Sequence, residues 1–386
     1  MAPQLASIFY LPADRDYSRA TGTETSDAFE QLMAGLEGGH ALAFASGMAA
    51  AHVVLNRLHA GATLAIPVDP YHGVKGLAVE AEQQGRWKIL RIELDDTQGW
   101  IDAAMVADLL WLETPANPLM TVCDIPAICS APRKDGTIVA VDSTFATPLV
   151  QRPLDFGADV VMHSATKFIG GHGTSIGGVL IDGGTFDYAA SGRFPGFTEP
   201  DPSYHGLAYF PALGHGAFII KARVQLLRDL GCATTPFNSF MFLQGLETLS
   251  LRMERHWSNA NAVAAHLDGH AGVSEVLHSS LASSPWHERA NELGGGKGYG
   301  SVLAFVLEGG IEAGKKFVEA LELHSHVANI GDVRSLCIHP ASTTHSQLNE
   351  TEQLASGVQP GLVRLSVGLE SIDDILADIE KGFAAI

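Results

Sequence analysis

The 386-residue chain is poor in cysteine and in basic residues. It has only four cysteines, and their one close spacing, between Cys123 and Cys129, fits neither a disulfide framework nor a zinc site. We therefore expect reduced thiols, a cytoplasmic protein and no bound metal. Lys and Arg total 24 against 43 Asp and Glu, for a formal charge of −19. This balance disfavours nucleic acids and anionic membranes as partners, so a small anionic ligand would need local donors.

Long apolar runs, basic leaders and low-complexity tracts are also missing. No segment approaches the roughly eighteen apolar residues of a membrane span, and residues 1–16 lack a basic region followed by an apolar one. We expect neither secretion nor membrane insertion. Hydrophobic residues make up 46% and charged residues 17% of the chain, which indicates a well-buried globular protein. The length allows one large domain and a smaller one.

Apolar segments of strand length alternate with helical segments over the first two-thirds of the chain, which predicts an α/β fold with a mostly parallel sheet flanked by helices. Later segments predict a smaller α+β domain. We expect an N-terminal arm over residues 1–20, a large domain over 21–244 and a C-terminal domain over 245–386. The Gly-, Pro- and aromatic-rich stretch 182–216 predicts a long ordered loop, and one long helix is predicted from Pro236.

A helix is predicted over residues 25–36, capped by Ser26 or Asp27 and ended by Gly38-Gly39. Its expected buried face consists of Phe29, Leu32, Met33 and Leu36. After it come an apolar strand, a Ser-Gly turn and an alanine-rich helix. That order places free backbone N–H groups where a phosphate could bind, although most such turns merely connect two elements.

Residues 139–173 carry the strongest chemical signal. One apolar run ends in Asp142, and a second ends in His163 and is followed by Ser164-Ala-Thr166-Lys167 and a glycine-rich loop. The last residue of a buried parallel strand faces the crevice where α/β sheets bind ligands. Lysine is the usual nucleophile toward carbonyls, and an aspartate facing a pyridinium nitrogen is its companion in pyridoxal-phosphate enzymes. The hypothesis is a pyridoxal-phosphate enzyme with Lys167 as the aldimine lysine.

Each signal also fits a simpler interpretation when taken alone. A lysine after Ser-x-Thr is typical of a solvated loop, and a strand-end aspartate is equally typical of a helix cap or an ion pair. The motifs along the rest of the chain favour the catalytic hypothesis. They are, in order, Tyr17-Ser-Arg19, LEGG with ASGMAA, PYHG, ETPANP, VDSTFATP, HSATKFIGGHG, HPASTTH and RLSVGLE.

In order and spacing, these eight blocks resemble the Cys/Met-metabolism pyridoxal-phosphate enzymes. That family includes cystathionine γ-synthase, cystathionine γ-lyase, methionine γ-lyase and O-acetylhomoserine sulfhydrylase. The resemblance covers nearly the whole chain and implies an aspartate-aminotransferase-like (type I) fold. It also implies that Lys167 carries pyridoxal 5'-phosphate and moves protons, and that Asp142 keeps the pyridine nitrogen protonated.

The resemblance implies further cofactor contacts. The backbone N–H groups of Gly47 and Met48 and the hydroxyls of Ser164 and Thr166 would bind the phosphate. Tyr71 would stack on the cofactor ring and serve in acid–base steps, although a core aromatic beside a turn would look the same. Tyr17 and Arg19 would reach the phosphate of a neighbouring subunit, which implies a homo-oligomer: a dimer that shares its active sites, and a tetramer of such dimers.

The resemblance also implies a substrate site. Arg364 would bind the substrate α-carboxylate in a bidentate grip, to which a planar guanidinium is suited. Asn117 would assist near the carboxylate and Thr344 would orient Arg364, though either fits a turn or cap residue. Asn329 would line the substrate pocket. Ser143 departs from the family pattern, which has Asn there, and the arm before Tyr17 is short, which puts assembly beyond the dimer in question.

The two halves of the chain resemble different branches. Residues 17–167 resemble the cystathionine γ-synthase and γ-lyase branch, and residues 168–386 the O-acetylhomoserine sulfhydrylase branch; a natural recombinant and an engineered chimera would both carry such a pattern. We expect a transferase of methionine biosynthesis that replaces the γ-acetate of O-acetyl-L-homoserine with sulfide or a small thiol. The alternatives are cystathionine γ-synthase, a cystathionine or methionine γ-lyase of transsulfuration and, remotely, a non-catalytic oligomer that retains the fold.

Overall fold

Apolar strands followed by amphipathic helices build the first of two units in the computed structural model, which describes residues 17–295 and 300–386. The arm expected over residues 1–20 falls mostly outside these residues. Within them, the first unit comprises the chain up to Glu113, Cys123–Gly170 and Thr174–Leu246. The second comprises Thr114–Val122, Gly171–Gly173 and Glu247–Ile386.

The first unit holds a seven-stranded sheet in the order β1-β7-β6-β5-β4-β2-β3. The pairs from β6 to β3 are parallel, and β7 pairs antiparallel with both β1 and β6. The predicted mostly parallel sheet is therefore confirmed. The strands are β1 (His40–Phe44), β2 (Ala62–Pro67), β3 (Trp87–Ile92), β4 (Leu109–Glu113), β5 (Ile138–Asp142), β6 (Val160–His163) and β7 (Gly178–Asp182).

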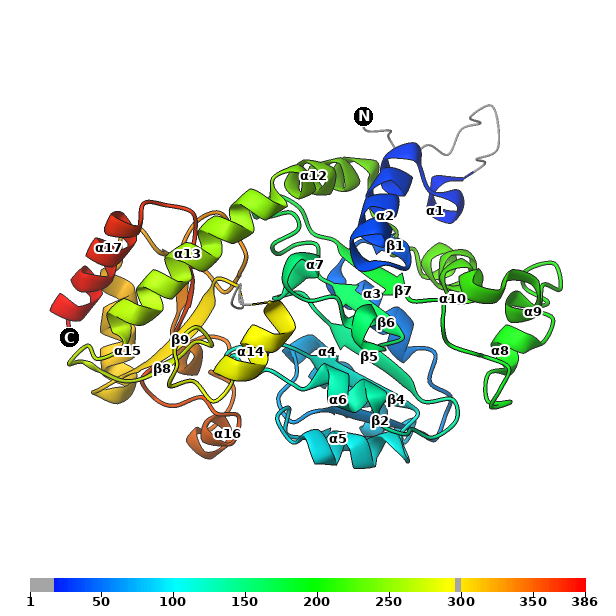
Figure 1. Ribbon diagram of the computed structural model, residues 1–386, viewed down its shortest axis with the longest axis horizontal. Helices are drawn as coiled ribbons and strands as arrows, with labels where there is room; N and C mark the ends of the chain where they lie inside the picture. Colours follow the sequence, from blue (N-terminus) through cyan, green and yellow to red (C-terminus); the bar gives the residue numbers. More distant parts are fainter. Residues whose placement is uncertain (1–16, 296–299) are drawn as a thin grey trace. The chain divides into compact units, whose positions relative to one another are not determined.

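Helices cover both faces of this sheet (Figure 1). On one face α3, α4 and α10 pack on the larger apolar cluster, and on the other Phe29 of α2 and Phe242 of α12 pack against Val161 and Val179. The helices are α1 (Ser18–Thr21), α2 (Glu24–Glu37), α3 (Gly47–Leu55), α4 (His72–Gln83), α5 (Thr97–Ala104), α6 (Ile125–Ser130), α7 (Thr147–Val150), α8 (Pro195–Thr198), α9 (Tyr209–Leu213), α10 (Ala217–Lys221), α11 (Arg228–Leu230) and α12 (Pro236–Glu247). Short helical turns, among them α8 and α9, interrupt the predicted 182–216 loop.

The second unit holds a five-stranded sheet in the order β10-β11-β12-β9-β8, in which only β10 and β11 pair in parallel. Helices α13, α15 and α17 pack apolar side chains on one face of it. The elements are α13 (Leu249–Leu267), β8 (Val273–Leu277), α14 (His287–Gly294), β9 (Val302–Leu307), α15 (Gly310–Ala320), β10 (Ser325–His326), β11 (Leu336–Ile338), α16 (Glu350–Ala355), β12 (Leu362–Ser366) and α17 (Ile372–Ala384).

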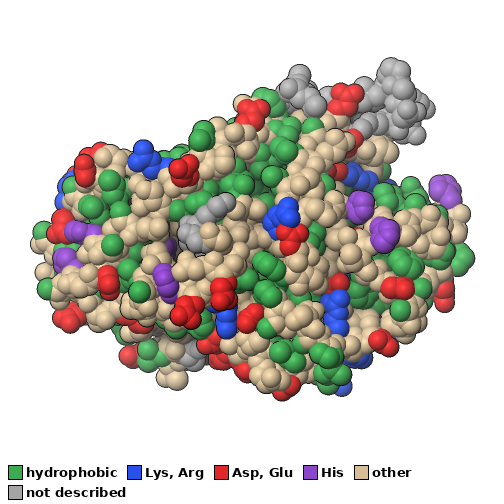
Figure 2. Space-filling view, viewed as in Figure 1, with side chains coloured by type: hydrophobic (Ala, Val, Ile, Leu, Met, Phe, Trp, Pro, Cys, Tyr) green, Lys and Arg blue, Asp and Glu red, His purple; other side chains and the backbone are tan. Residues whose placement is uncertain are grey.

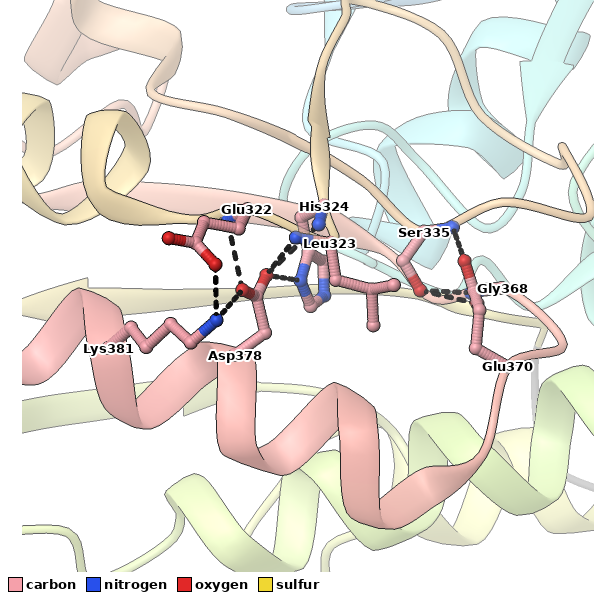
Figure 3. Close-up of polar contacts among 8 residues, drawn as sticks. All are labelled: Glu322, Leu323, His324, Ser335, Gly368, Glu370, Asp378 and Lys381. Carbon is pink, nitrogen blue, oxygen red and sulfur yellow. Dashed lines mark hydrogen bonds and ion pairs between the residues drawn. The ribbon is translucent and has the colours of Figure 1, made fainter.

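Two carboxylates, the buried Asp378 and the partly buried Glu370, hold the loops of this second unit (Figure 3). Asp378 of α17 accepts hydrogen bonds from three consecutive backbone N–H groups, Glu322, Leu323 and His324, and from His324 Nδ1. Glu370 accepts from the backbone N–H and the hydroxyl of Ser335. These contacts hold the ends of the segment that carries Asn329.

Charged side chains of both signs are interspersed on the face shown in Figure 2. None of the helices among the described residues is both long and apolar enough to cross a bilayer. In the same residues, no three His, Cys, Asp or Glu side chains are grouped as ligands for a metal ion.

Candidate active site

Two acidic strand ends lie side by side in the first unit. Glu113 ends β4 and Asp142 ends β5, and the two residues are paired in the parallel ladder. Both are largely buried, at 5% and 8% exposure. Burial, and then the charge of the neighbouring Asp142 carboxylate, raise the pKa of Glu113 to about 8. Two adjacent buried carboxyl groups favour a cationic ligand between or beside them.

Thr144 connects Asp142 to Ser164. Its hydroxyl donates to Asp142 Oδ1 at 2.6 Å and accepts from the Ser164 backbone N–H at 2.9 Å, and its own N–H also donates to Asp142 Oδ1. Burial raises the pKa of Asp142, while the Thr144 hydrogen bonds and the charge of His163 act against this rise. Both described hydrogen bonds of Asp142 thus reach one oxygen, which leaves Oδ2 for a further donor.

The N-terminus of α3 forms the anion-binding side of the site. Ser46 caps the helix by accepting from the Ala49 N–H at 3.1 Å, and the helix then begins with Gly47 and Met48, whose N–H groups point out of the first turn. A Cβ atom at position 47 would lie 2.9 Å from Ser164 Cβ and 3.1 Å from its hydroxyl oxygen. The absence of a side chain at position 47 therefore allows Ser164 to approach this helix end.

Ser164, Thr166 and Lys167 follow β6 in one tight turn. The Lys167 N–H donates to the Ser164 carbonyl at 3.1 Å, and the Thr166 hydroxyl exchanges hydrogen bonds with the backbone of Gly177 at 3.0 and 3.1 Å. All three side chains are partly buried. The turn therefore places the Ser164 hydroxyl, the Thr166 hydroxyl and the Lys167 amine in succession directly after β6.

Tyr71 precedes α4 and is 37% exposed. Its N–H donates to Glu113 Oε2 at 2.7 Å. Burial, then Asp142, then Glu113 raise the pKa of its phenol, so it stays protonated at neutral pH. A Cβ atom at Gly73 would lie 2.6 Å from Met48 Sδ and 3.1 Å from Tyr71 Cε1, so both side chains close in on this glycine.

The second unit brings two of the expected substrate residues, Asn117 and Asn329, to the buried guanidinium of a third, Arg364. Arg364 of β12 is 5% exposed and donates to Asn117 Oδ1 at 2.9 Å and to the Asn329 carbonyl at 3.1 Å. Its Nε is buried without a hydrogen-bond partner among the described residues, and burial lowers the pKa of Arg364 to about 10. The described partner of the Thr344 hydroxyl is His345 Nδ1, at 3.0 Å. Arg364 thus has neutral acceptors only, which suits it to an anionic ligand.

Tyr17 and Arg19 lie at α1, where the Arg19 guanidinium stacks 4.9 Å from the centre of the Tyr17 ring.

Three residues near the cofactor position were missed by sequence reasoning: Glu113, Thr144 and His163. Glu113 ends an apolar run in the same way as Asp142, so the same signal could have identified it. The Thr144 and His163 contacts depend on strand pairing, which no local pattern encodes.

Comparisons with known proteins place this geometry in a family. The family model described as Cys/Met metabolism PLP-dependent enzyme matches residues 11–384. The chain belongs to this family. It is similar to the O-acetyl-L-homoserine sulfhydrylase of Leptospira meyeri (44% identity; 94% of this chain, 84% of that protein) and to that of Corynebacterium glutamicum (46%; 96% and 86%).

Two solved structures are similar to this member of the family over nearly its whole length. A putative O-acetylhomoserine (thiol)-lyase from Campylobacter jejuni, which contains a pyridoxyl-lysine monophosphate, has a TM-score of 0.90 at 34% identity and covers 95% of this chain and 88% of its own. A cystathionine gamma synthase from Xanthomonas oryzae pv. oryzae, in complex with aminoacrylate and cysteine, has a TM-score of 0.84 at 34% identity and covers 100% and 94%. The expected fold and the pyridoxal-phosphate dependence are confirmed.

The residues present fit the cofactor at both of its charged ends. Asp142 and Glu113 form an acidic pair that a pyridinium N–H would neutralise. The N–H groups that begin α3, beside the Ser164 hydroxyl, suit a phosphate. Thr144 joins the two ends through one hydroxyl. When bound, the cofactor supplies an electron sink for reactions at the substrate's α-carbon.

Proposed function

We propose that this enzyme replaces the γ-acetate of O-acetyl-L-homoserine with sulfide or a small thiol, which gives homocysteine or methionine. The observation that carries the proposal is the similarity to curated O-acetyl-L-homoserine sulfhydrylases and homocysteine synthases, at 41% to 46% identity over 94% to 96% of the chain. This function makes the chain a cytoplasmic enzyme of methionine biosynthesis.

Each proposed residue has one task in this reaction. Lys167 holds the cofactor through its ε-amine and moves protons at the substrate's α- and β-carbons, for which the amine must be neutral. Asp142 accepts the hydrogen bond of the ring nitrogen and keeps its proton in place. The phosphate is held by a set of six residues, namely Gly47, Met48, Ser164, Thr166 and, from a neighbouring subunit, Tyr17 and Arg19.

Substrate binding uses the second unit. Arg364 binds the α-carboxylate, which supplies the anion that its buried guanidinium lacks, and Asn117 and the Asn329 carbonyl hold the guanidinium in its plane. In this proposal Thr344 helps to orient Arg364. Tyr71 covers the cofactor ring and, as a protonated phenol, can donate to the substrate. Because Tyr17 and Arg19 act in a neighbouring subunit, the enzyme is an oligomer, with a dimer as the smallest active form.

The test is a steady-state comparison on the purified holoenzyme. We expect kcat/KM for O-acetyl-homoserine with sulfide to exceed that for O-succinyl-homoserine, and that for cysteine as the nucleophile, by at least about tenfold, or about 1.4 kcal/mol. The Lys167→Ala variant should lose turnover and the visible absorbance of the cofactor, whereas Lys315→Ala, at an exposed ion pair on α15, should keep both. A yellow, fully active Lys167→Ala protein would contradict the mechanism.

The second candidate is a cystathionine γ-synthase, which the similarity to the Xanthomonas enzyme favours. Under that function cystathionine would form from cysteine faster than homocysteine forms from sulfide. Formation of 2-oxobutyrate from methionine or cystathionine without an added nucleophile would instead identify a γ-lyase.

A further inference from the structure

A buried carboxyl group at the end of β4 holds the backbone of the residue that precedes α4. The Tyr71 N–H donates to Glu113 Oε2 at 2.7 Å, across 42 positions of the chain. Among the described residues, this is the only hydrogen bond of the Glu113 side chain, and Glu113 is 5% exposed. None of the roles proposed above uses this contact.

The backbone of Tyr71 is held from both sides. Its carbonyl accepts the N–H groups of Val74 and Lys75 at 2.9 and 3.1 Å, which begins α4, while its phenol makes no hydrogen bond at the helix cap. With the N–H bonded to β4 and the carbonyl to α4, both backbone polar groups of Tyr71 are used. Only the side-chain torsions then remain to be set.

Packing holds the phenol ring only in part. The ring lies 4.3 Å from the His72 ring, centre to centre, and close to Gly73, yet Tyr71 is 37% exposed. A half-exposed side chain has few neighbours to fix it, so its position depends on the backbone that carries it. The Glu113 contact is therefore needed to place the ring.

The same contact brings Tyr71 to the proposed cofactor position. Glu113 and Asp142 are register partners in the parallel ladder of β4 and β5. Residues that lie level with each other on neighbouring strands point to the same face of a sheet. The Glu113 carboxyl thus lies beside Asp142, and its hydrogen bond holds the start of α4 at this edge.

We propose that Glu113 is a positioning residue for Tyr71: its carboxyl group fixes the backbone from which the phenol extends over the cofactor ring. The inference deepens the function proposed above, because it rests on the proposed role of Tyr71. The contact requires an oxygen acceptor and no charge. A glutamine at position 113 would keep such an acceptor at the same reach, whereas an alanine would not.

The test compares Glu113→Ala with Glu113→Gln. In the apoprotein, amide exchange of the peptide that contains Tyr71 should speed up at least about tenfold in the alanine variant and stay within about threefold of the parent in the glutamine variant. In the holoenzyme, the alanine variant should bind pyridoxal phosphate about tenfold more weakly and lose about tenfold in kcat, and the glutamine variant should recover most of both losses. KM for O-acetyl-homoserine should stay within about twofold, since Arg364 is untouched.

A double-mutant cycle with Tyr71→Ala separates positioning from a direct effect on the cofactor. If Glu113 acts through Tyr71, adding Glu113→Ala to Tyr71→Ala should change the cofactor's affinity and kcat by less than about twofold. A full tenfold loss in that background would show that Glu113 acts on the cofactor directly, and the inference would be wrong. If Tyr71→Ala alone leaves affinity and kcat at the parent values, the proposed role of Tyr71 fails instead.

Asp108, just before the other end of β4, is the matched control. It is 7% exposed, and its Oδ2 accepts the Thr63 N–H at 2.6 Å. Asp108→Ala should lower the unfolding temperature and leave the cofactor's affinity and kcat at the parent values. If Glu113→Ala behaves in the same way, the Glu113 contact is only structural and the proposal is overturned.

Glu113→Asp decides the question if Glu113→Ala does not fold. Its carboxyl group is one methylene shorter, which withdraws the acceptor from the Tyr71 N–H. We expect a smaller loss of kcat that disappears in the Tyr71→Ala background, together with faster exchange at Tyr71. Parent values for both exchange and kcat would overturn the proposal.

Discussion

Arg364 is a buried cation whose described acceptors, the side-chain oxygen of Asn117 and the carbonyl of Asn329, are both neutral. We expect Arg364→Lys to raise KM for O-acetyl-homoserine about 10- to 100-fold, because an ammonium cannot form the paired hydrogen bonds of a guanidinium and each charged hydrogen bond contributes about 1.5–3 kcal/mol. The value of kcat should fall less. Steady-state kinetics at saturating sulfide measure both parameters.

Arg91→Lys is the matched control for this change. Arg91 pairs with Glu82 at an exposed site, where both side chains are about 40% exposed, and the substitution should leave KM within about twofold. An Arg364→Lys enzyme with the parent KM would show that another group binds the α-carboxylate.

Ser143 departs from the family's Asn, and its hydroxyl is fully buried without a hydrogen-bond partner among the described residues. An unsatisfied buried hydroxyl stabilises nothing, so Ser143→Ala should leave the free energy of unfolding unchanged or raise it by up to about 1 kcal/mol. Thr144→Val is the contrasting variant, because it removes the hydroxyl shared by Asp142 and Ser164 and should cost about 1–3 kcal/mol. Denaturant unfolding measures both; a loss above 1 kcal/mol for Ser143→Ala would contradict this account.

The sequence predicted Asp142 but not its surroundings, for a physical reason. A carboxylate at the end of an apolar run is visible in one dimension, and the sheet then carries it to the crevice. Thr144 and Glu113 act through contacts across 20 and 42 positions of the chain, and those contacts exist only after β4, β5, β6 and α4 have packed. The other site residues were predicted from the family motifs, because such motifs reflect contacts between residues that are distant in the sequence.

At the scale of helices and loops, Asp378 shows how a helix fixes the loop that packs against it. Three backbone N–H groups and the His324 ring all donate to its carboxylate, which is 2% exposed (Figure 3). Burial alone would raise the pKa of Asp378, but these hydrogen bonds outweigh it and hold the pKa below its usual value. The carboxylate form is therefore the one that stabilises the fold.

We expect Asp378→Asn to lower the free energy of unfolding by about 1.5–3 kcal/mol at neutral pH. A group with a depressed folded-state pKa contributes its stability above the unfolded-state pKa, here about 4, and loses it as the pH falls through the folded-state value. The difference between parent and variant should therefore be constant above about pH 5 and shrink below about pH 4. Urea unfolding at several pH values measures it, and a difference that grows in acid would contradict the assignment.

Helix boundaries show where pattern reasoning stops. The helix predicted over residues 25–36 exists, and Gly38 ends it as expected, but its N-cap is Thr23 and not Ser26 or Asp27. Ser26 instead completes a capping box by bonding back to the Thr23 N–H at 2.8 Å. Phe29 and Met33 are buried, whereas Leu32 is 41% exposed, because the packed face is narrower than the apolar pattern.

The prediction of one long helix from Pro236 was also wrong, because the helix is interrupted. The segment forms two helices, α12 and α13, that part at Thr248. The apolar pattern continues through this position, so the sequence gives no local signal for a break. The break coincides with the change from the first unit to the second at Leu246 and Glu247, and two separate cores then determine how each helix packs.

At the scale of the whole molecule, the composition predicted a large buried α/β protein, and the chain has separate apolar cores in its two units. The fold class followed from alternating strands and helices, since right-handed crossovers leave few arrangements for such a pattern. The antiparallel strand β7 was not predicted, because an apolar strand carries no mark of its direction. Its position between β1 and β6 places Gly178 against the Ser46 carbonyl, where a Cβ atom would lie 2.3 Å from that oxygen.

The division into units predicts how the protein responds to loss of its cofactor. The proposed cofactor residues within one subunit all belong to the first unit, so removal of pyridoxal phosphate should destabilise that unit and spare the second. At a hundredfold excess over its dissociation constant a ligand contributes about 2.7 kcal/mol, so amide exchange governed by opening of the first unit should speed up by as much as about 100-fold. Hydrogen-exchange mass spectrometry of holo- and apoprotein compares peptides from β5 and β6 with peptides from β9 and β12. Equal acceleration in both sets would mean that the two units open together, and then the cofactor stabilises the chain as one cooperative body.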